Sequence, residues 1–370
     1  MRFRDRILGL LGLGPERSQG AGRKRGPATH VIVLDGTMSS LRPGCETNAG
    51  KTYKLLCEVG QKANLTVYYE AGVQWQDWSK TWDVASGKGI NRQIERAYGV
   101  LASRYRPGDK IVLIGYSRGA FAVRSLAGVI DMVGLVKAEH ATARNIRSVY
   151  RYYRLGSANG DATVFTNRFC HDEVAIEAVA AWDTVKALGL RLPVFWRWAE
   201  ARHEFHNHRL GPSVRHGFHA LALDETRDAF TPVLWSSPEG WAGKMEQVWF
   251  KGTHGDIGGQ LTGYEPARPL ANIPLVWMLE RLEDCGLELP VGWRGRFPCD
   301  PSAPMVGTWQ GWGKLFVSRH KRVIGQDPSE RLHDSVPSDH RFANAMKEPQ
   351  APVKSEFVAS GTNGLSSEAS

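Results

Sequence analysis

Cysteine pairs, long apolar runs and leader-type cleavage sites are scarce or missing in this 370-residue sequence. The five cysteines are odd in number, widely scattered and form no Cys-x-x-Cys pair, which argues against a disulfide framework and a zinc site. No apolar run reaches the length of a membrane-spanning helix, and no small-residue cleavage site follows the short apolar run at residues 7–13. We therefore expect a cytoplasmic protein with reduced thiols, no secretory signal, and neither a metal nor an organic cofactor.

The sequence has fewer acidic than basic residues: 38 Asp and Glu and 47 Lys and Arg give a formal net charge of +9. Much of the excess lies in the first 26 residues, where basic side chains interleave with the short apolar run. This pattern is typical of a basic amphipathic segment, residues 2–25, that makes peripheral contact with the inner face of an anionic membrane. A solvated tail is the alternative. We expect no nucleic-acid partner.

Apolar runs alternate with helix-like segments through the middle of the chain. Five runs predict buried strands, at residues 30–34, 65–69, 110–114, 174–181 and 247–250. Helical spacing of apolar residues predicts helices over 90–105 and 120–130. The alternation predicts an α/β fold with a mostly parallel central sheet, right-handed crossovers and helices on both faces.

Composition divides the chain into one α/β domain, residues 29–346, between two irregular ends. Residues 1–28 form the basic segment, for which we expect flexibility, and residues 347–370 are rich in Pro, Ser and Gly and are expected to be disordered. Residues 198–241 are rich in His, Arg and Trp with weak periodicity. That stretch suggests a helical or irregular, lid-like insertion.

A Gly-x-Ser-x-Gly motif, Gly115-Tyr116-Ser117-Arg118-Gly119, follows one predicted strand directly and opens the next predicted helix. With 40 glycines in 370 residues, chance alone yields roughly one such motif in four chains, so the motif by itself is weak. The strand–turn–helix setting is what a nucleophile elbow requires. We therefore predict that Ser117 is a catalytic nucleophile.

A serine hydroxyl needs a base, and the base needs an orienting carboxylate. On this type of fold the order along the chain is Ser, then Asp or Glu, then His. Asp183 and His254 fit that order, and each follows a predicted strand. Alternatives remain open: Asp183 could instead cap a helix, Asp256 could be the acid, and the base could be His219 or, less favoured, His333.

An oxyanion hole and a phosphate-binding loop are two further features that the sequence allows us to weigh. For the oxyanion hole we nominate the backbone N–H of Arg118, with a second donor from the Gly36–Thr37 loop after the first strand. The segment Gly44–Thr52 resembles a phosphate-binding loop, but it has five residues between its glycines where that motif has four. We therefore expect no nucleotide cofactor.

Several ordered segments resemble the signatures of an α/β-hydrolase domain family related to the lipase effectors of bacterial type VI secretion, which act as phospholipases. These segments are Leu34–Thr37, Gly115–Phe121, Ala181–Val185 and Phe250–Gly259, with family-like stretches at 219–230 and 332–336. The resemblance implies an α/β-hydrolase fold with Ser117, Asp183 and His254 as its triad. We expect two departures from the pattern: no large appended membrane-targeting domain, and Lys251 where a small residue or Pro is expected.

These observations together predict a serine esterase that cleaves a carboxylic ester, and the resemblance implies a phospholipid acyl ester as substrate. A second hypothesis is a catalytically silent, membrane-associated binding or regulatory protein on the same fold. Intact Ser, Asp and His candidates in the expected order favour the enzyme.

Overall fold

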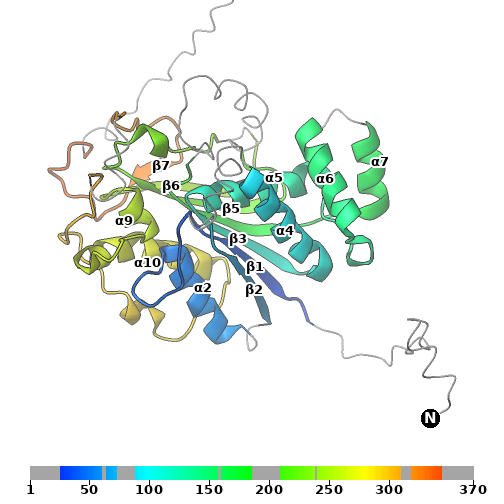
Figure 1. The fold of residues 1–370 in the computed structure, drawn as a ribbon, viewed down its shortest axis with the longest axis horizontal. Coiled ribbons are helices and arrows are strands. Elements are labelled where there is room, and N and C mark those ends of the chain that lie inside the picture. Colours follow the sequence, from blue (N-terminus) through cyan, green and yellow to red (C-terminus); the bar gives the residue numbers. More distant parts are fainter. Residues whose placement is uncertain are drawn as a thin grey trace, which may run out of the picture.

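A seven-stranded sheet with every neighbouring pair of strands parallel forms the centre of the molecule (Figure 1). The computed structural model describes residues 26–60, 64–72, 88–156, 160–185, 209–237, 240–309 and 318–343. The strand order is β2-β1-β3-β4-β5-β6-β7. The strands are β1 (Thr29–Leu34), β2 (Leu65–Glu70), β3 (Lys110–Tyr116), β4 (Ile176–Trp182), β5 (Val214–Ala222), β6 (Lys244–Phe250) and β7 (Glu330–Leu332).

Helices cover both faces of this sheet, because its strands are apolar on both sides. In β1, Ile32 and Leu34 belong to one apolar cluster, whereas Val31 and Val33 belong to the other. The first cluster includes side chains of α4 (Lys88–Arg104), α5 (Arg118–Val133), α6 (Ala143–Leu155) and α7 (Gly160–Phe169). The second includes side chains of α2 (Asn48–Val59), α9 (His254–Gly258) and α10 (Arg268–Asp284). The predicted α/β fold is thus confirmed.

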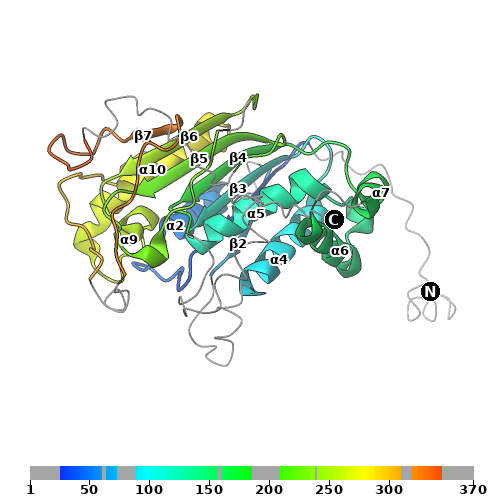
Figure 2. The same cartoon turned by 90° about the horizontal axis from the view of Figure 1, so that it is seen from above.

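Four short 3₁₀ helices complete the secondary structure of the described residues: η2 (Ala138–His140), η4 (Asp228–Phe230), η5 (Glu265–Ala267) and η6 (Trp293–Arg296). Figures 1 and 2 both place α6 and α7 at one end of the molecule and α9 at the other. Among the helices in the described ranges, none combines the length and apolar content needed to cross a bilayer.

The insertion expected at residues 198–241 is wrong for residues 214–222, because they form β5, in the sheet between β4 and β6. The strand escaped prediction because His216, Gly217 and His219 interrupt its apolar pattern. These polar groups are accommodated by hydrogen bonds, as when His216 Nδ1 pairs with the Glu177 carbonyl at 2.9 Å. Residues 198–208 lie outside the described residues.

The boundary of the flexible segment expected at residues 1–28 also needs correction. Ala28 is buried and its N–H donates to Asp109 Oδ1 at 2.8 Å, while the Asn64 amide donates to the carbonyl oxygens of Gly26 and Pro27. Residues 26–28 therefore already belong to the folded domain. The membrane-contact prediction for residues 2–25 and the tail at 347–370 lie outside the described residues.

Candidate active site

Ser117 occupies the tight turn between β3 and α5, with φ 58° and ψ −122°. A non-glycine residue in this region costs about 1–3 kcal/mol and persists only where the surroundings enforce it. The enforcement comes partly from the Ser117 N–H, which donates to the Trp182 carbonyl at 2.9 Å. The flanking glycines provide the rest, since a Cβ on Gly115 would lie 2.6 Å from the backbone of Ala120.

Because Gly119 has no side chain, the backbone of α5 can lie in direct contact with the backbone at the end of β1. A Cβ on Gly119 would lie 2.0 Å from the Leu34 carbonyl oxygen, and backbone atoms have little freedom to withdraw. We expect Gly119→Ala to destabilise the fold by about 3 kcal/mol, the upper range of overpacking. Gly295→Ala is the matched control, because nothing lies within 4 Å of its added carbon. Equal melting temperatures for the two variants would contradict the expectation.

Ser117, Asp183 and His254 meet at the carboxyl ends of β3, β4 and β6. Ser117 Oγ lies 2.9 Å from His254 Nε2, and His254 Nδ1 lies 2.6 Å from Asp183 Oδ2. With Nδ1–H donating to the carboxylate, Nε2 is left to accept the hydroxyl proton. At most 5% of any of these residues is exposed, so their interactions occur where water screens them little.

Asp183 is held in one orientation by backbone and side-chain donors. Its own N–H donates to Ala220 O, and its Oδ1 accepts the Ala222 N–H at 3.0 Å. The guanidinium of Arg322 donates to both oxygens, Nη1 to Oδ1 at 2.5 Å and Nη2 to Oδ2 at 2.9 Å. Burial alone would raise the pKa of Asp183, but Arg322 and His254 outweigh it and hold this pKa well below its usual range. Asp183 is therefore ionised at neutral pH.

His254 is enclosed by two aromatic rings and anchored through its backbone. Its imidazole stacks on Tyr116, with 4.9 Å between ring centroids, and the Phe230 ring lies at 4.7 Å. The His254 N–H donates to Glu225 Oε2 at 3.1 Å. Burial lowers the pKa of His254 more than the neighbouring carboxylates raise it, so the imidazole is neutral at pH 7 and able to accept a proton.

The alternative acid and bases have other partners. Asp256 is the N3 residue of the capping box that begins α9 at Thr253: its Oδ2 accepts from the N–H and hydroxyl of Thr253, and its Oδ1 accepts from the Val306 N–H. His219 Nε2 accepts the Thr184 N–H at 3.1 Å, and its Nδ1 faces Gln247 Oε1. His333 pairs with Ser335 Oγ at 2.8 Å. The structure thus brings none of the three into hydrogen-bond contact with Ser117.

The loop nominated for the oxyanion hole lies against the nucleophile turn. A Cβ on Gly36 would be 3.3 Å from Ser117 Cβ. The Gly36 N–H, however, donates to Asp35 Oδ1 at 2.7 Å, so this donor is occupied and its nomination is corrected. Within the described ranges, the N–H groups of Thr37 and Arg118 form no hydrogen bond, so both remain candidates for the oxyanion hole.

Asp35 anchors that loop from a fully buried position. Its Oδ2 accepts the hydroxyls of Thr47 and Tyr69 at 2.7 and 2.8 Å. Burial raises the pKa of Asp35 to about 6, although the hydrogen bonds from Thr47, Tyr69 and Gly36 oppose the rise. No local pattern in the sequence predicts this role, although Asp35 lies in the family-like segment Leu34–Thr37.

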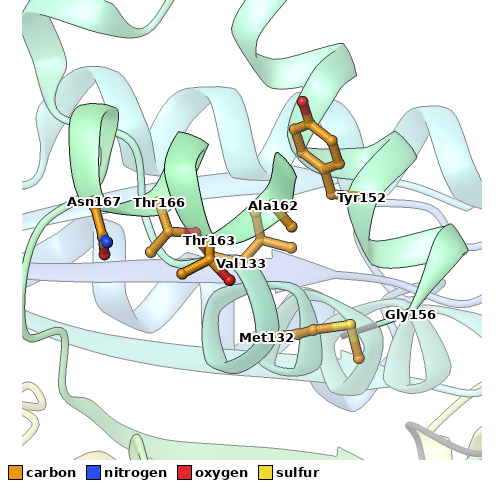
Figure 3. A pocket seen from close by; sticks show the side chains of 8 residues that line it. All are labelled: Met132, Val133, Tyr152, Gly156, Ala162, Thr163, Thr166 and Asn167. Atoms are coloured by element: carbon orange, nitrogen blue, oxygen red, sulfur yellow. The ribbon is translucent and has the colours of Figure 1, made fainter. Parts of the chain in front are cut away.

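A cavity of about 130 Å³ opens between the last turn of α5 and helices α6 and α7 (Figure 3). Met132 and Val133 of α5 line it, together with Tyr152, Gly156, Ala162, Thr163, Thr166 and Asn167. At 1.5 Å per residue, the length of α5 separates it from Ser117 by roughly 20 Å. The cavity is therefore separate from the Ser117 site. In the described part of the chain, no cluster of His, Cys, Asp or Glu could hold a metal ion.

A parallel sheet that presents a serine on a strand–turn–helix, with an acid and a histidine from later strand ends, defines the α/β-hydrolase fold. The family described as type VI secretion phospholipase effector Tle1-like, catalytic domain, matches residues 29–281, and the chain belongs to this family. The uncharacterized protein YEL023C of Saccharomyces cerevisiae is 26% identical over 248 residues, which are 59% of this chain and 35% of that protein. The chain thus spans about a third of the length of this relative.

The solved structures to which the chain is similar include the following three. An uncharacterized protein from Pseudomonas aeruginosa is 16% identical, with a TM-score of 0.42 over 74% of this chain and 49% of that chain. The Tle1 effector bound to the VgrG spike of the type VI secretion system is 19% identical, with a TM-score of 0.35 over 64% and 51%. A thermophilic esterase from Thermogutta terrifontis is 13% identical, with a TM-score of 0.38 over 73% and 86%.

Proposed function

We propose that this chain is a serine hydrolase that cleaves the acyl ester of a phospholipid, with Ser117 as nucleophile, His254 as general base and Asp183 as the orienting acid. The observation that carries the proposal is the continuous hydrogen-bonded path from Ser117 Oγ through the His254 imidazole to Asp183. This arrangement supports acyl transfer to a serine, and the family to which the chain belongs supports a phospholipid ester as the substrate.

Acylation begins when Ser117 Oγ attacks the ester carbonyl carbon and His254 Nε2 takes the hydroxyl proton. The C–O bond to the leaving alcohol then breaks, and the imidazolium returns the proton to that oxygen. Water attacks the acyl-enzyme by the same route, releasing the fatty acid and restoring Ser117. Asp183 holds the Nδ1–H tautomer throughout, which keeps Nε2 directed at the reacting oxygen.

The negative charge of each tetrahedral intermediate needs donors beside the Ser117 side chain. We assign this role to the Arg118 N–H, at the positive end of α5, and to the Thr37 N–H in the adjoining loop. A donor of this kind is worth about 10²–10³ in kcat. Asp35 supports the arrangement by keeping the Gly36–Thr37 loop beside Ser117.

Labelling with a fluorophosphonate tests the proposal. We expect wild-type protein to be labelled and Ser117→Ala to remain unlabelled, since only an activated serine reacts. Mixed phospholipid vesicles should slow the labelling, and a short-chain p-nitrophenyl ester should compete more weakly. Thermal melts would show that Ser117→Ala remains folded.

Other outcomes are equally informative. Labelling blocked only by the short-chain ester would keep the hydrolase and reject the phospholipid. A well-folded wild type that never reacts would reject the hydrolase and favour a binding protein that retains the fold without turnover.

A further inference from the structure

Arg322 makes the largest set of side-chain contacts with the Asp183 carboxylate, from a segment 139 residues further along the chain. Its two Nη atoms form a fork on both carboxylate oxygens. The same atoms also donate to the carbonyl oxygens of Ala222 and Phe230, at 2.9 and 2.6 Å. Arg322 is 4% exposed, so the pair is shielded from water.

This arrangement changes the charge around His254. A carboxylate next to a histidine normally stabilises the imidazolium, but the positive charge of Arg322, in a contact of 2.5 Å with Asp183, offsets part of that effect. The second carboxylate near His254, Glu225, is likewise paired with Arg227 at 2.6 Å. Both acids beside the base are thus paired with arginines, which weaken the attraction of each carboxylate for a proton on His254.

The other polar groups that surround Asp183 and His254 add no charge beside the imidazole. Tyr116 packs on the imidazole, and burial raises its pKa far above the ordinary value, so it is uncharged. Burial keeps His219, behind Asp183, neutral by lowering its pKa to about 3. Asp256 takes part in the capping box of α9 through its own hydrogen bonds and makes none with the imidazole.

We propose that Arg322 is a positioning residue for the proposed reaction: it fixes the Asp183 carboxylate in one orientation and, by offsetting part of its charge, favours the unprotonated His254 imidazole that acts as the base. The inference rests on the proposed function, since it assigns Arg322 a role in that site. A guanidinium suits the role because its planar fork matches a carboxylate, whereas a lysine places one point charge.

The test is an NMR titration of the His254 imidazole in full-length protein with selectively labelled histidine. The resonance is assigned by its disappearance in His254→Gln. In Arg322→Met we expect the pKa of His254 to rise by about one unit, because the Asp183 charge is no longer partly offset. Arg322→Lys should give a smaller rise, since it keeps the charge and loses the fork.

Arg319→Met is the matched control. Arg319 lies on the same segment and donates to the hydroxyls of Thr226 and Thr308, not to Asp183. A purely structural role for Arg322 predicts that both Met variants lose stability and that neither shifts the His254 titration. An unchanged His254 pKa in folded Arg322→Met overturns the inference.

The readout separates the two proposals, because it requires no turnover. If the wild type fails to hydrolyse any ester but the titration shifts as expected, the proposed function fails and the electrostatic assignment stands. If the wild type is active and the titration is unmoved, only the assignment fails. If the enzyme is active, the fall of kcat/KM on the acid side of its pH profile should occur at a pH about one unit higher in Arg322→Met than in the wild type.

Discussion

Asp183→Asn is expected to lower kcat for ester hydrolysis by about 10⁴-fold while changing KM little. The amide of asparagine can present an N–H to His254 Nδ1, which then accepts, so the proton moves to Nε2. A protonated Nε2 faces the Ser117 hydroxyl as a donor and no longer removes its proton. The 2.6 Å contact between Asp183 and His254 makes this reversal of the tautomer the direct consequence.

Stability must be measured beside activity in this variant. The Asp183→Asn substitution would leave the Arg322 guanidinium buried without its carboxylate, and breaking a buried pair costs about 3–5 kcal/mol. Activity should therefore be compared at a temperature where the melt shows the variant folded. Circular dichroism and the thermal midpoint supply that check.

Asp256→Asn is the matched carboxamide control for Asp183→Asn. It removes the charge from the cap of α9 and leaves the Asp183–His254 contact in place. We expect activity within about tenfold of wild type, because a cap is worth about 1 kcal/mol. If Asp256→Asn lost 10⁴-fold and Asp183→Asn did not, the assignment of the acid would be reversed.

The sheet was predictable where runs of mostly apolar residues end at residues that carry chemistry. The runs that became β1, β3, β4 and β6 meet this description, and apolar side chains of each pack in clusters on both faces of the sheet. β5 was not predictable in this way, because His216 and His219 are polar in the sequence and become compatible with burial only through distant partners. Gln247, which faces His219, is 28 residues away.

Some residues of the candidate site were predictable from the sequence and others were not. Ser117, Asp183 and His254 were proposed from their order and from strand ends, and parallel strands bring their carboxyl ends to one edge. Arg322 follows no predicted element, and its partner lies 139 residues earlier, so no local spacing could reveal it. The engagement of the Gly36 N–H by Asp35 was also hidden, because it depends on the direction of one peptide group.

His219→Gln is expected to change strongly how the free energy of unfolding depends on pH. In the folded protein, burial lowers the pKa of His219 to about 3, against 6.5 for an ordinary histidine. As pH falls below 6.5, the unfolded chain takes up a proton and the folded protein does not, so stability is lost. Between pH 7 and pH 4 this contribution amounts to about 3 kcal/mol.

Asp35 changes the free energy of unfolding in the opposite direction over nearly the same pH range. Its pKa is about 6 when folded, against 3.8 ordinarily, so the folded protein takes up a proton first and gains stability as pH falls from 6 to 3.8. The gain is about 2–3 kcal/mol by pH 4. In the wild type these two contributions therefore largely cancel, and groups such as Asp183, whose lowered pKa acts below 3.8, are common to all variants.

Urea unfolding at pH 7, 5.5 and 4 would separate the two groups. His219→Gln should lose less stability than the wild type on acidification, since only the Asp35 gain remains, whereas Asp35→Asn should lose more. The introduced glutamine can still accept the Thr184 N–H, and the introduced asparagine can still accept the Gly36 N–H, so both variants should fold at pH 7. Parallel stability curves for all three proteins would show that neither buried group titrates in the folded state as inferred. Curves that diverge in opposite directions would establish a neutral His219 behind Asp183 and a protonatable Asp35 behind the Gly36–Thr37 loop.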